Sequence, residues 1–412
     1  MIRRISFRGL PVAARPVATA LRIGAALLVS VGALAAIPAG VAGTSHGVTF
    51  AALATTSQTA GGFTPDQIAS AYDITPLQNQ GIDGTGQTIA LIELDRLSVS
   101  DLQAFDQAAG LPDPTVRQIY QGGRTFKLPV AGEADLDVEW AHALAPGASI
   151  QVYYIKSNQT DAMGWAAVGQ AVNSAVAAGA GTISLSFGTC SADAGYTAAS
   201  KAFAAAVQHG VSVFVASGDS GARPGPVKMC GNVYGVSYPA SDPSVVAVGG
   251  TTLALNGDNS IQSETAWRLS GGGKAKPLLR PSWQLTASLL PGRYRYVPDV
   301  AFLANPSTGV DMVLKGRLAV AGGTSLGSPA WSAIWSLVRA SGAQSGVTVG
   351  AAPAMLYRVG NSSLYSQALH DITQGTNGRY KAAVGWDPVT GWGTPDVAGL
   401  ATAVQSLSTA TP

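Results

Sequence analysis

The sequence has few charged residues and few of the side chains that bind transition metals. Charged residues make up 12% of its 412 residues, and there are two cysteines and four histidines. The histidines show no ligand spacing with Cys190 and Cys230, which argues against a zinc site. In an exported protein such a pair predicts one disulfide, with two buried thiols as the alternative. Glycine is abundant but follows no period, which excludes collagen-like and repeat proteins.

Long hydrophobic runs are also missing, except near the N-terminus. There, five arginines precede an apolar run at 23–36, and small residues follow at 38–43. This pattern is typical of a secretory signal peptide over residues 1–43, with an uncleaved membrane anchor as the alternative. A flexible leader is expected at 44–62, and a helix capped by Thr64 should begin the ordered chain. We therefore expect a secreted, extracellular protein with no stable membrane association after signal removal.

The charge balance gives no sign of a nucleic-acid partner. The chain has 25 Lys and Arg against 23 Asp and Glu. Without the five arginines of the expected signal, 20 basic residues face 23 acidic ones, a net charge of −3. The exported part therefore lacks the basic excess that neutralises phosphates. Sparse carboxylates also limit acid unfolding, which is compatible with an acidic working environment.

Strand and helix patterns alternate along the chain. Short apolar runs typical of buried strands lie at 88–94, 149–155, 181–186, 211–216 and 245–248. Helical patterns lie at 98–110, 133–144, 161–178 and 194–209, and a proline-marked turn follows the first of them. Continuous apolar strands between helices predict an α/β fold with a mostly parallel central sheet and helices on both faces. Active sites in such sheets lie beyond the carboxyl ends of the strands, where Ser217–Gly221 is placed.

The stretch Gly322–Pro329 carries the first sign of chemistry. An apolar run at 318–321, predicted to be a buried strand, precedes it, and a helical pattern at 330–340 follows. Ser325 therefore lies where a strand passes through glycines into a helix. Glycines allow a substrate to approach the backbone, and the first helical N–H groups point toward it, so the position suits a nucleophile. A glycine turn with a serine cap is the alternative.

One predicted helix carries four acids. Glu133 and Asp137, four residues apart, fall within its apolar stripe, whereas Asp135, Glu139 and His142 fall on the opposite side. Two carboxylates on one buried face raise each other's pKa, and sharing a proton relieves the repulsion. In the alternative interpretation, Glu133 caps the helix and Asp137 binds a neighbouring loop.

No histidine lies in the glycine-rich motif that would supply a subtilisin-type base. The pair Glu133 and Asp137 is therefore the best candidate base for Ser325, and a carboxylate acts as a base near its own pKa, in acid. Asp219, within Ser217–Gly221, could be protonated at low pH and donate to a developing oxyanion, with the Ser325 N–H as second donor. An Asp-anchored turn is the alternative for that segment.

Several motifs, in order from about residue 63 to the C-terminus, resemble those of the sedolisins, the serine-carboxyl peptidases. They are Glu133-Ala-Asp-Leu-Asp137, Ser217-Gly-Asp-Ser-Gly221, Tyr238-Pro-Ala-Ser, Glu264-Thr-Ala-Trp267, Pro298-Asp299-Val300 and Gly323-Thr-Ser-Leu-Gly-Ser-Pro329. Each motif alone is modest, and their order makes the match strong. The resemblance implies a subtilisin-like fold and a sedolisin-like peptidase domain over 63–412.

The resemblance also implies roles for single residues. Ser325 would be the nucleophile, Glu133 the base, Asp137 the partner of Glu133, and Asp219 a donor in the oxyanion hole. Glu93, in the first predicted strand, matches an acid that extends the proton network in some members.

A calcium site near the C-terminus is a further implication of the resemblance. Its ligands would be the side chains of Asp371 and Asp387 and the carbonyls of Ile372, Ala383 and Gly385, within the six to eight oxygens that Ca²⁺ takes. Ala383 stands where relatives often have glycine, and its carbonyl can still bind if the backbone angles allow alanine. Without the resemblance, this loop is interpreted as turn-rich and metal-free.

Two departures from the family pattern bear on rate and pH optimum more than on reaction type. Relatives carry a large N-terminal pro-domain, whereas only the segment 44–62 separates the expected signal from the catalytic domain here. Phe187 stands where some relatives have tryptophan beside the acid network.

The sequence therefore predicts a secreted, acid-acting, monomeric serine endopeptidase that cleaves proteins or peptides. A catalytically silent, sedolisin-like secreted binding protein is the rival from another class, and the full set of four site residues argues against it. An esterase is a second rival, which a comparison of peptides with simple esters would separate.

Overall fold

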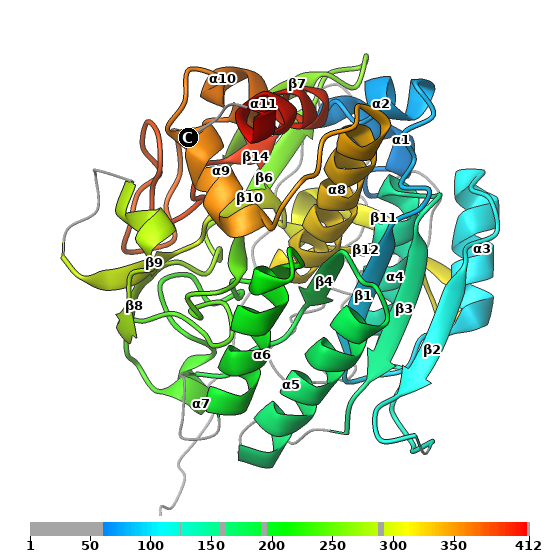
Figure 1. Cartoon of the computed structure of the whole chain (residues 1–412), viewed down its shortest axis with the longest axis horizontal. Coiled ribbons are helices and arrows are strands. Elements are labelled where there is room, and N and C mark those ends of the chain that lie inside the picture. Colours follow the sequence, from blue (N-terminus) through cyan, green and yellow to red (C-terminus); the bar gives the residue numbers. More distant parts are fainter. Residues whose placement is uncertain (1–60, 124, 157–161, 191–195, 287–291, 410–412) are drawn as a thin grey trace, which may run out of the picture. The chain divides into compact units, whose positions relative to one another are not determined.

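The computed structural model of the chain describes residues 61–123, 125–156, 162–190, 196–286 and 292–409 (Figure 1). The expected signal peptide at 1–43 and all but the last two residues of the leader lie outside these ranges. Within them, no helix is both long and apolar enough to cross a bilayer.

The centre of the fold is an eight-stranded sheet with strand order β10-β6-β5-β4-β1-β3-β2, to which β7 adds beside β6. Its strands are β1 Thr88–Glu93, β2 Val116–Tyr120, β3 Ser149–Tyr154, β4 Thr182–Leu185, β5 Ser212–Ala216, β6 Val246–Leu255, β7 Ile261–Ala266 and β10 Val300–Leu303. Every neighbouring pair is parallel except β6 and β7. The predicted α/β class with a mostly parallel sheet is thus confirmed.

Helices cover both faces of this sheet. On one face lie α5 (Ala162–Ala177) and α6 (Thr197–Gln208), which run side by side in Figure 1. On the other lie α4 (Glu133–Leu144) and α8 (Thr324–Gln344). In β1, Ala90 and Ile92 pack toward the first pair, and Ile89 and Leu91 toward the second, so the strand is buried on both sides.

Smaller elements surround this core. The other helices are α1 Pro65–Ala71, α2 Thr75–Asn79, α3 Val99–Ala109, α7 Val227–Cys230, α9 Ala352–Gly360, α10 Tyr365–Ala368 and α11 Val397–Thr409, with 3₁₀ turns at Ser282–Thr286 and Pro306–Thr308. Three two-stranded sheets pair β8 Gly273–Leu279 with β9 Tyr294–Val297, β11 Val310–Leu314 with β12 Arg317–Ala321, and β13 Leu369–His370 with β14 Thr394–Pro395.

Local sequence signals set several helix ends. Thr64 caps α1: its hydroxyl accepts from the Gln67 N–H at 3.4 Å, and the Gln67 side chain accepts from the Thr64 N–H at 3.0 Å. This is a capping box, with Pro65 at the first helical position. The helix predicted at 133–144 matches α4 residue for residue.

Two segments differ from the sequence prediction. Residues 116–120, which follow a predicted turn, form the edge strand β2; its middle residues are polar and exposed, so it lacks the apolar run of a buried strand. The run at 318–321, predicted to be a buried strand, belongs to β12, which pairs antiparallel with β11 outside the main sheet. Leu318 is 48% exposed there, because a small hairpin has one face without cover.

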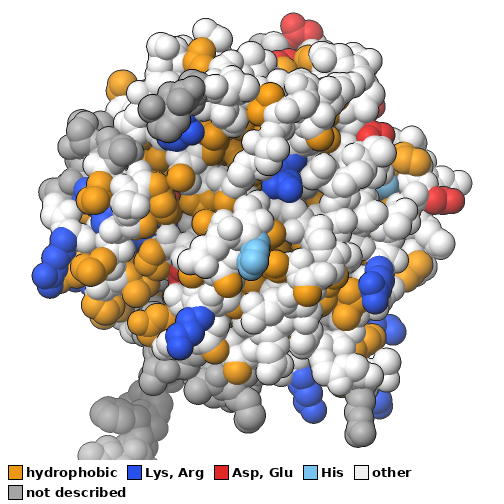
Figure 2. Space-filling view, in the orientation of Figure 1, with side chains coloured by type: hydrophobic (Ala, Val, Ile, Leu, Met, Phe, Trp, Pro, Cys, Tyr) orange, Lys and Arg blue, Asp and Glu red, His pale blue; other side chains and the backbone are white. Residues whose placement is uncertain are grey.

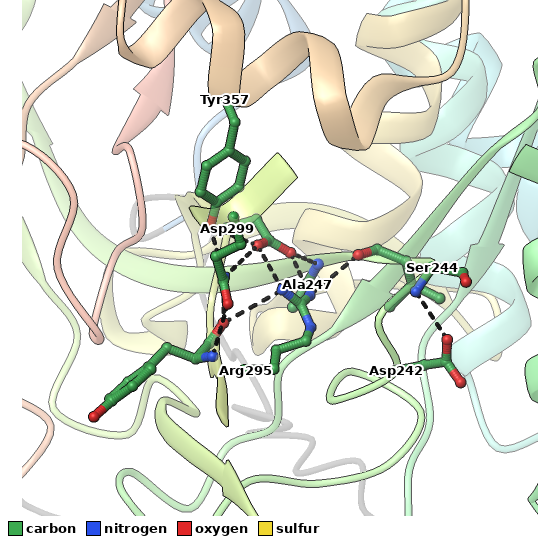
Figure 3. A network of polar contacts seen from close by, with 9 residues as sticks. Asp242, Ser244, Ala247, Arg295, Asp299 and Tyr357 are labelled. Atoms are coloured by element: carbon green, nitrogen blue, oxygen red, sulfur yellow. Dashed lines mark hydrogen bonds and ion pairs between the residues drawn. The ribbon is translucent and has the colours of Figure 1, made fainter. Parts of the chain in front are cut away.

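The motif Pro298-Asp299-Val300 has a structural role. Arg295 donates to both carboxylate oxygens of Asp299, at 2.6 and 3.0 Å, and both side chains are buried (Figure 3). Asp299 also accepts from the Ala247 N–H at 2.7 Å and from the Tyr357 hydroxyl at 2.9 Å. A buried pair of this kind needs such additional partners to offset its desolvation. It ties the loop before β10 to β6 and α9.

Candidate active site

The start of α8 presents Ser325. The helix begins at Thr324, directly after Gly323, whose φ of 99° favours glycine. Because the first N–H groups of a helix have no partner within it, the Ser325 N–H has no acceptor among the described residues. The Ser325 hydroxyl lies 3.4 Å from the Ser186 carbonyl oxygen. The serine therefore offers a hydroxyl and a free N–H from one position.

An acid network lies beside this serine. Glu93 comes from the carboxyl end of β1, Asp137 from α4, and Ser186 from the residue after β4. The Ser186 hydroxyl donates to Asp137 at 2.6 Å and lies 3.2 Å from the Ser325 carbonyl oxygen. A hydrogen bond also joins Glu93 and Asp137; beside the larger effect of burial, it raises the pKa of Glu93 further and lowers that of Asp137.

Burial dominates the protonation of these acids. It raises the pKa of Asp137 to about 8, although hydrogen bonds from Ser186 and Glu93 favour its charged form. The pKa of Glu133 is raised by burial and then by the charge of Asp137, while the facing Ser325 hydroxyl opposes the rise. The site therefore holds protons well above the pH at which exposed carboxyls lose theirs.

The structure adds partners to the pair of acids predicted on α4. A shared proton was expected between Glu133 and Asp137, four residues apart on α4. Asp137 also bonds Glu93 and accepts from Ser186, and its charge raises the pKa of Glu133 after burial has done so. In the part of the chain that the structure describes, both Glu133 oxygens are buried without a donor in regular hydrogen-bonding geometry, although Ser325 faces them. Glu133 is thus the acid left available to the serine hydroxyl.

Asp219 lies shortly after β5, and its side chain contacts the first residue of α8. One of its oxygens, Oδ1, accepts from the Thr324 N–H at 2.9 Å and from the Thr324 hydroxyl at 2.8 Å. The other, Oδ2, would lie 2.7 Å from a Cβ at Gly323, and the Ser325 nitrogen lies 3.8 Å from the same point. Burial raises the pKa of Asp219 to about 6. In acid, the protonated Oδ2 and the Ser325 N–H would therefore be two hydrogen-bond donors near the same position beside Gly323.

The far side of α4 is buried too. Its acids Asp135 and Glu139 were predicted opposite the apolar stripe, and they point there, but neither reaches solvent. Asp135 accepts from the Ser98 N–H at 2.6 Å, and Glu139 accepts from the Val313 N–H at 3.0 Å. His142 bonds the Pro112 carbonyl at 2.9 Å, away from Ser325. Figure 2 shows few acidic side chains on its face of the molecule, because many of the acids are inside.

These buried acids predict a stability that falls as the pH rises. Asp106, 3.6 Å from His142, has no hydrogen-bond partner among the described residues, and burial raises its pKa to about 7. Burial lowers the pKa of His142, so the two do not form an ion pair at neutral pH. The folded state binds more protons than the unfolded state between about pH 4 and 7, so the free energy of unfolding decreases across that window.

Thermal melting of the wild type and of Asp106→Asn at several pH values measures this effect. The neutral amide should reduce the decrease of melting temperature with rising pH. At pH 7 the variant should be more stable than the wild type by about 1 kcal/mol, after allowance for solvent screening. The exposed Asp258→Asn is the control. A melting temperature that rises from pH 4 to pH 7 in the wild type would contradict the argument.

A pocket adjoins the serine, and the sequence did not reveal it. Its wall is formed by residues 186–190, Ala216, 218–220, 224–226, Met229, Cys230, Ser237, Thr324 and Ser325. Cys190 and Cys230 form the predicted disulfide, which borders the pocket. Phe187 also lines it. Asp219 is the one charged residue of the described lining, so the pocket suits an uncharged side chain.

The expected calcium ligands also lie together. Asp371 accepts from the Gly385 N–H at 2.8 Å with one oxygen, and within the described residues its other oxygen is buried without a partner of regular geometry, although the Tyr365 hydroxyl is near. Asp387 accepts from the N–H groups of Val389 and Thr390 at 2.7 and 3.0 Å, and from Ala383 at 3.2 Å. Burial raises the pKa of Asp387 to about 6.

Backbone oxygens would have to complete such a site. The described residues contain no cluster of three or more Asp, Glu, His and Cys side chains placed to hold a metal. Within the same part of the chain, the carbonyls of Ile372, Ala383 and Gly385 accept no hydrogen bond. Ala383 has a negative φ, which alanine adopts without strain. Backbone carbonyl oxygens of this kind are among the ligands that calcium takes.

Comparisons with known proteins agree with this architecture. The profile of the subtilase family matches residues 129–393. Kumamolisin of Bacillus sp. is 36% identical over 81% of this chain, and tripeptidyl-peptidase 1 of Canis lupus familiaris is 28% identical over 82%. This chain spans 62% and 64% of the lengths of these two relatives.

A solved structure is also similar to this chain in sequence and in fold. Pseudomonas sedolisin, a serine-carboxyl proteinase solved with two molecules of pseudo-iodotyrostatin, is 33% identical to this chain. The match covers 84% of this chain and 99% of that one, with a TM-score of 0.72.

Proposed function

The chain belongs to the subtilase family and within it to the sedolisins, and from this premise we propose that it is a secreted serine-carboxyl endopeptidase that works in acid. The observation that carries the proposal is that the Ser325 hydroxyl faces the Glu133 carboxylate, which has no other hydrogen-bond partner among the described residues, beside Asp219. Export is supported by the signal-like N-terminus and by the disulfide, which forms in oxidising compartments.

In the proposed reaction, Ser325 attacks the carbonyl carbon of a peptide bond. Glu133 takes the hydroxyl proton as the new bond forms, and later gives it to the leaving amine. The oxyanion lies between the Ser325 N–H and a protonated Asp219. Water then attacks the acyl-enzyme, Glu133 takes a proton from the water, and this proton passes to the Ser325 oxygen as the acid product leaves.

The protonation states set the pH range of this reaction. Glu133 must be ionised, so activity should be lost at low pH as Glu133 becomes protonated. Asp219 must keep its proton, so activity should fall as the pH rises through its pKa of about 6. Burial raises the pKa values of Asp137 and Glu93, so in acid both hold protons, which limits the negative charge beside Glu133. Activity is therefore confined to the interval above the pKa of Glu133, which burial raises, and below the pKa of Asp219 of about 6.

A pH profile of protein digestion by the purified secreted protein tests the proposal. Casein should be cleaved in acid and spared above neutral pH, and a peptide aldehyde should bind Ser325 and stop cleavage. A peptide with a blocked N-terminus should be cut internally, because an endopeptidase needs no free amine. Absence of both cleavage and aldehyde binding in acid would favour a silent binding protein.

We further propose that Asp371, Ile372, Ala383, Gly385 and Asp387 hold a calcium ion. Bound calcium would supply a cross-link between two loop segments, and no reacting group. A ligand that binds only the folded state stabilises it, by about 3 kcal/mol at roughly 100 times its Kd. The buried oxygen of Asp371 without a partner of regular geometry among the described residues supports the assignment.

Melting curves with calcium and with a chelator test this site. We expect calcium to raise the melting temperature of the wild type and of Asp258→Asn, whose aspartate lies on an exposed turn. Asp371→Asn should lose that shift, because a neutral amide is a weaker calcium ligand. An equal shift in all three proteins would place calcium elsewhere.

A further inference from the structure

Asp95 is a buried acid that the proposed reaction does not use. It lies two residues after Glu93, just beyond the carboxyl end of β1, and is 3% exposed. Its carboxylate faces the first turn of α4 and accepts from four consecutive backbone N–H groups. The distances are 2.9 Å from Ala131, 2.9 Å from Gly132, 3.2 Å from Glu133 and 3.0 Å from Ala134.

Helix α4 needs this outside partner because it has no cap of its own. The residue at its N-cap is Gly132, with φ of 105° and no side chain to accept a hydrogen bond. The first N–H groups of a helix have no partner within it, and a carboxylate there also meets the positive end of the helix dipole. Asp95 therefore does from another segment what a capping side chain does locally.

These contacts join the two segments that carry the acid network. Glu93 lies on β1, and Glu133 and Asp137 lie on α4. One of the four bonds goes to the N–H of Glu133 itself. Since Glu133 makes no side-chain hydrogen bond of regular geometry, its place beside Ser325 depends on its backbone and packing.

We propose that Asp95 is a positioning residue for the reaction: its carboxylate fixes the first turn of α4 and so holds Glu133 against Ser325. This inference rests on the proposed function, because it assigns Asp95 a role toward the same base. Misplacement of a catalytic group by about 1 Å can cost roughly 100-fold in rate, so a rigid anchor at this point matters.

The charge of Asp95 acts on the same groups. Four donors face its oxygens, and the described residues offer no acceptor for a carboxyl proton, so the contacts favour the ionised form; burial opposes this and raises its pKa. The titratable groups that face Asp95 come from three elements. They are Glu93 on β1, Glu133, Asp135 and Asp137 on α4, and the Tyr154 hydroxyl on β3. The neighbouring Arg96 side chain is exposed. A negative Asp95 therefore raises the pKa of Glu133.

Two substitutions separate position from charge. Asp95→Asn keeps the size but removes the charge, and its amide nitrogen meets N–H donors. Asp95→Glu keeps the charge but moves the oxygens by one methylene. The control is Asp396→Asn, since Asp396 caps Gly399 at the start of α11 at 2.9 Å, and that helix carries no proposed site residue.

The experiment measures kcat, KM and the pH profile of peptide cleavage per site titrated with a peptide aldehyde, together with the melting temperature. We expect kcat to fall by roughly 10- to 100-fold in both Asp95 variants, with KM changed less than about threefold. The acid limb of the profile should move to lower pH in Asp95→Asn and stay in place in Asp95→Glu. Asp396→Asn should keep the wild-type kcat and profile.

Several outcomes would overturn the inference. If both Asp95 variants keep the wild-type kcat per titrated site and the acid limb of the profile does not move, Asp95 is a helix cap only. The same conclusion follows if neither variant folds. If the wild type itself shows no activity that depends on Ser325, the proposed function fails instead. The wild-type measurement therefore distinguishes the two failures.

Discussion

Ser325→Ala should lose at least about 1,000-fold in kcat/KM toward casein in acid. The substitution removes the only atom that can form the acyl-enzyme, while the oxyanion donors and the pocket remain and leave a residual rate. Alanine lacks only the hydroxyl oxygen and favours a helix, so the fold should persist. Initial cleavage rates at about pH 3–5 and a melting curve measure the two effects.

The matched control for this variant is Ser328→Ala. Ser328 lies three residues further along α8, where its hydroxyl contacts the Ser184 hydroxyl at 2.8 Å and the Phe214 carbonyl at 3.0 Å. It is buried and does not line the pocket. Ser328→Ala should therefore reduce stability more than the rate per folded molecule. Unchanged casein cleavage by Ser325→Ala would refute the proposed mechanism.

Glu133→Gln should lower kcat by about 100- to 10,000-fold, the range associated with the loss of a general base. Glutamine has nearly the same shape, but its amide cannot take the Ser325 proton. It also relieves the charge interaction with Asp137, so the variant should be at least as stable as the wild type at neutral pH. Single-turnover acylation in acid measures the proton-transfer step most directly.

Glu139→Gln gives the comparison on the same helix. Glu139 is equally buried and also has a pKa raised by burial, but it accepts from the Val313 N–H on the far side of α4. Its loss should leave the acylation rate near that of the wild type. Equal rate losses in the two variants would mean that α4 acts through its charge or packing as a whole, with no specific base at Glu133.

Local signals account for what could be predicted of the fold. The bounds of α4 follow from residues within it and from Pro146 beyond it, and the capping box at Thr64 fixes the start of α1. Continuous apolar runs identified β1, β3, β4 and β5. The edge strand β2 and the hairpin strand β12 were missed or misplaced, because exposed strands and short hairpins lack that signal.

The sequence by itself determined which residues could carry the chemistry: a serine after glycines, two acids on one side of a helix, an aspartate after a strand, and a cysteine pair that does form a disulfide. Only the tertiary structure decided how these acids pair. Helical periodicity shows on which side of α4 Glu133 and Asp137 project. It does not show that Glu93 of β1 forms a hydrogen bond with Asp137, or that Asp95 binds the start of α4. Those contacts join segments far apart in the chain, and they arise only when β1, α4 and α8 pack together.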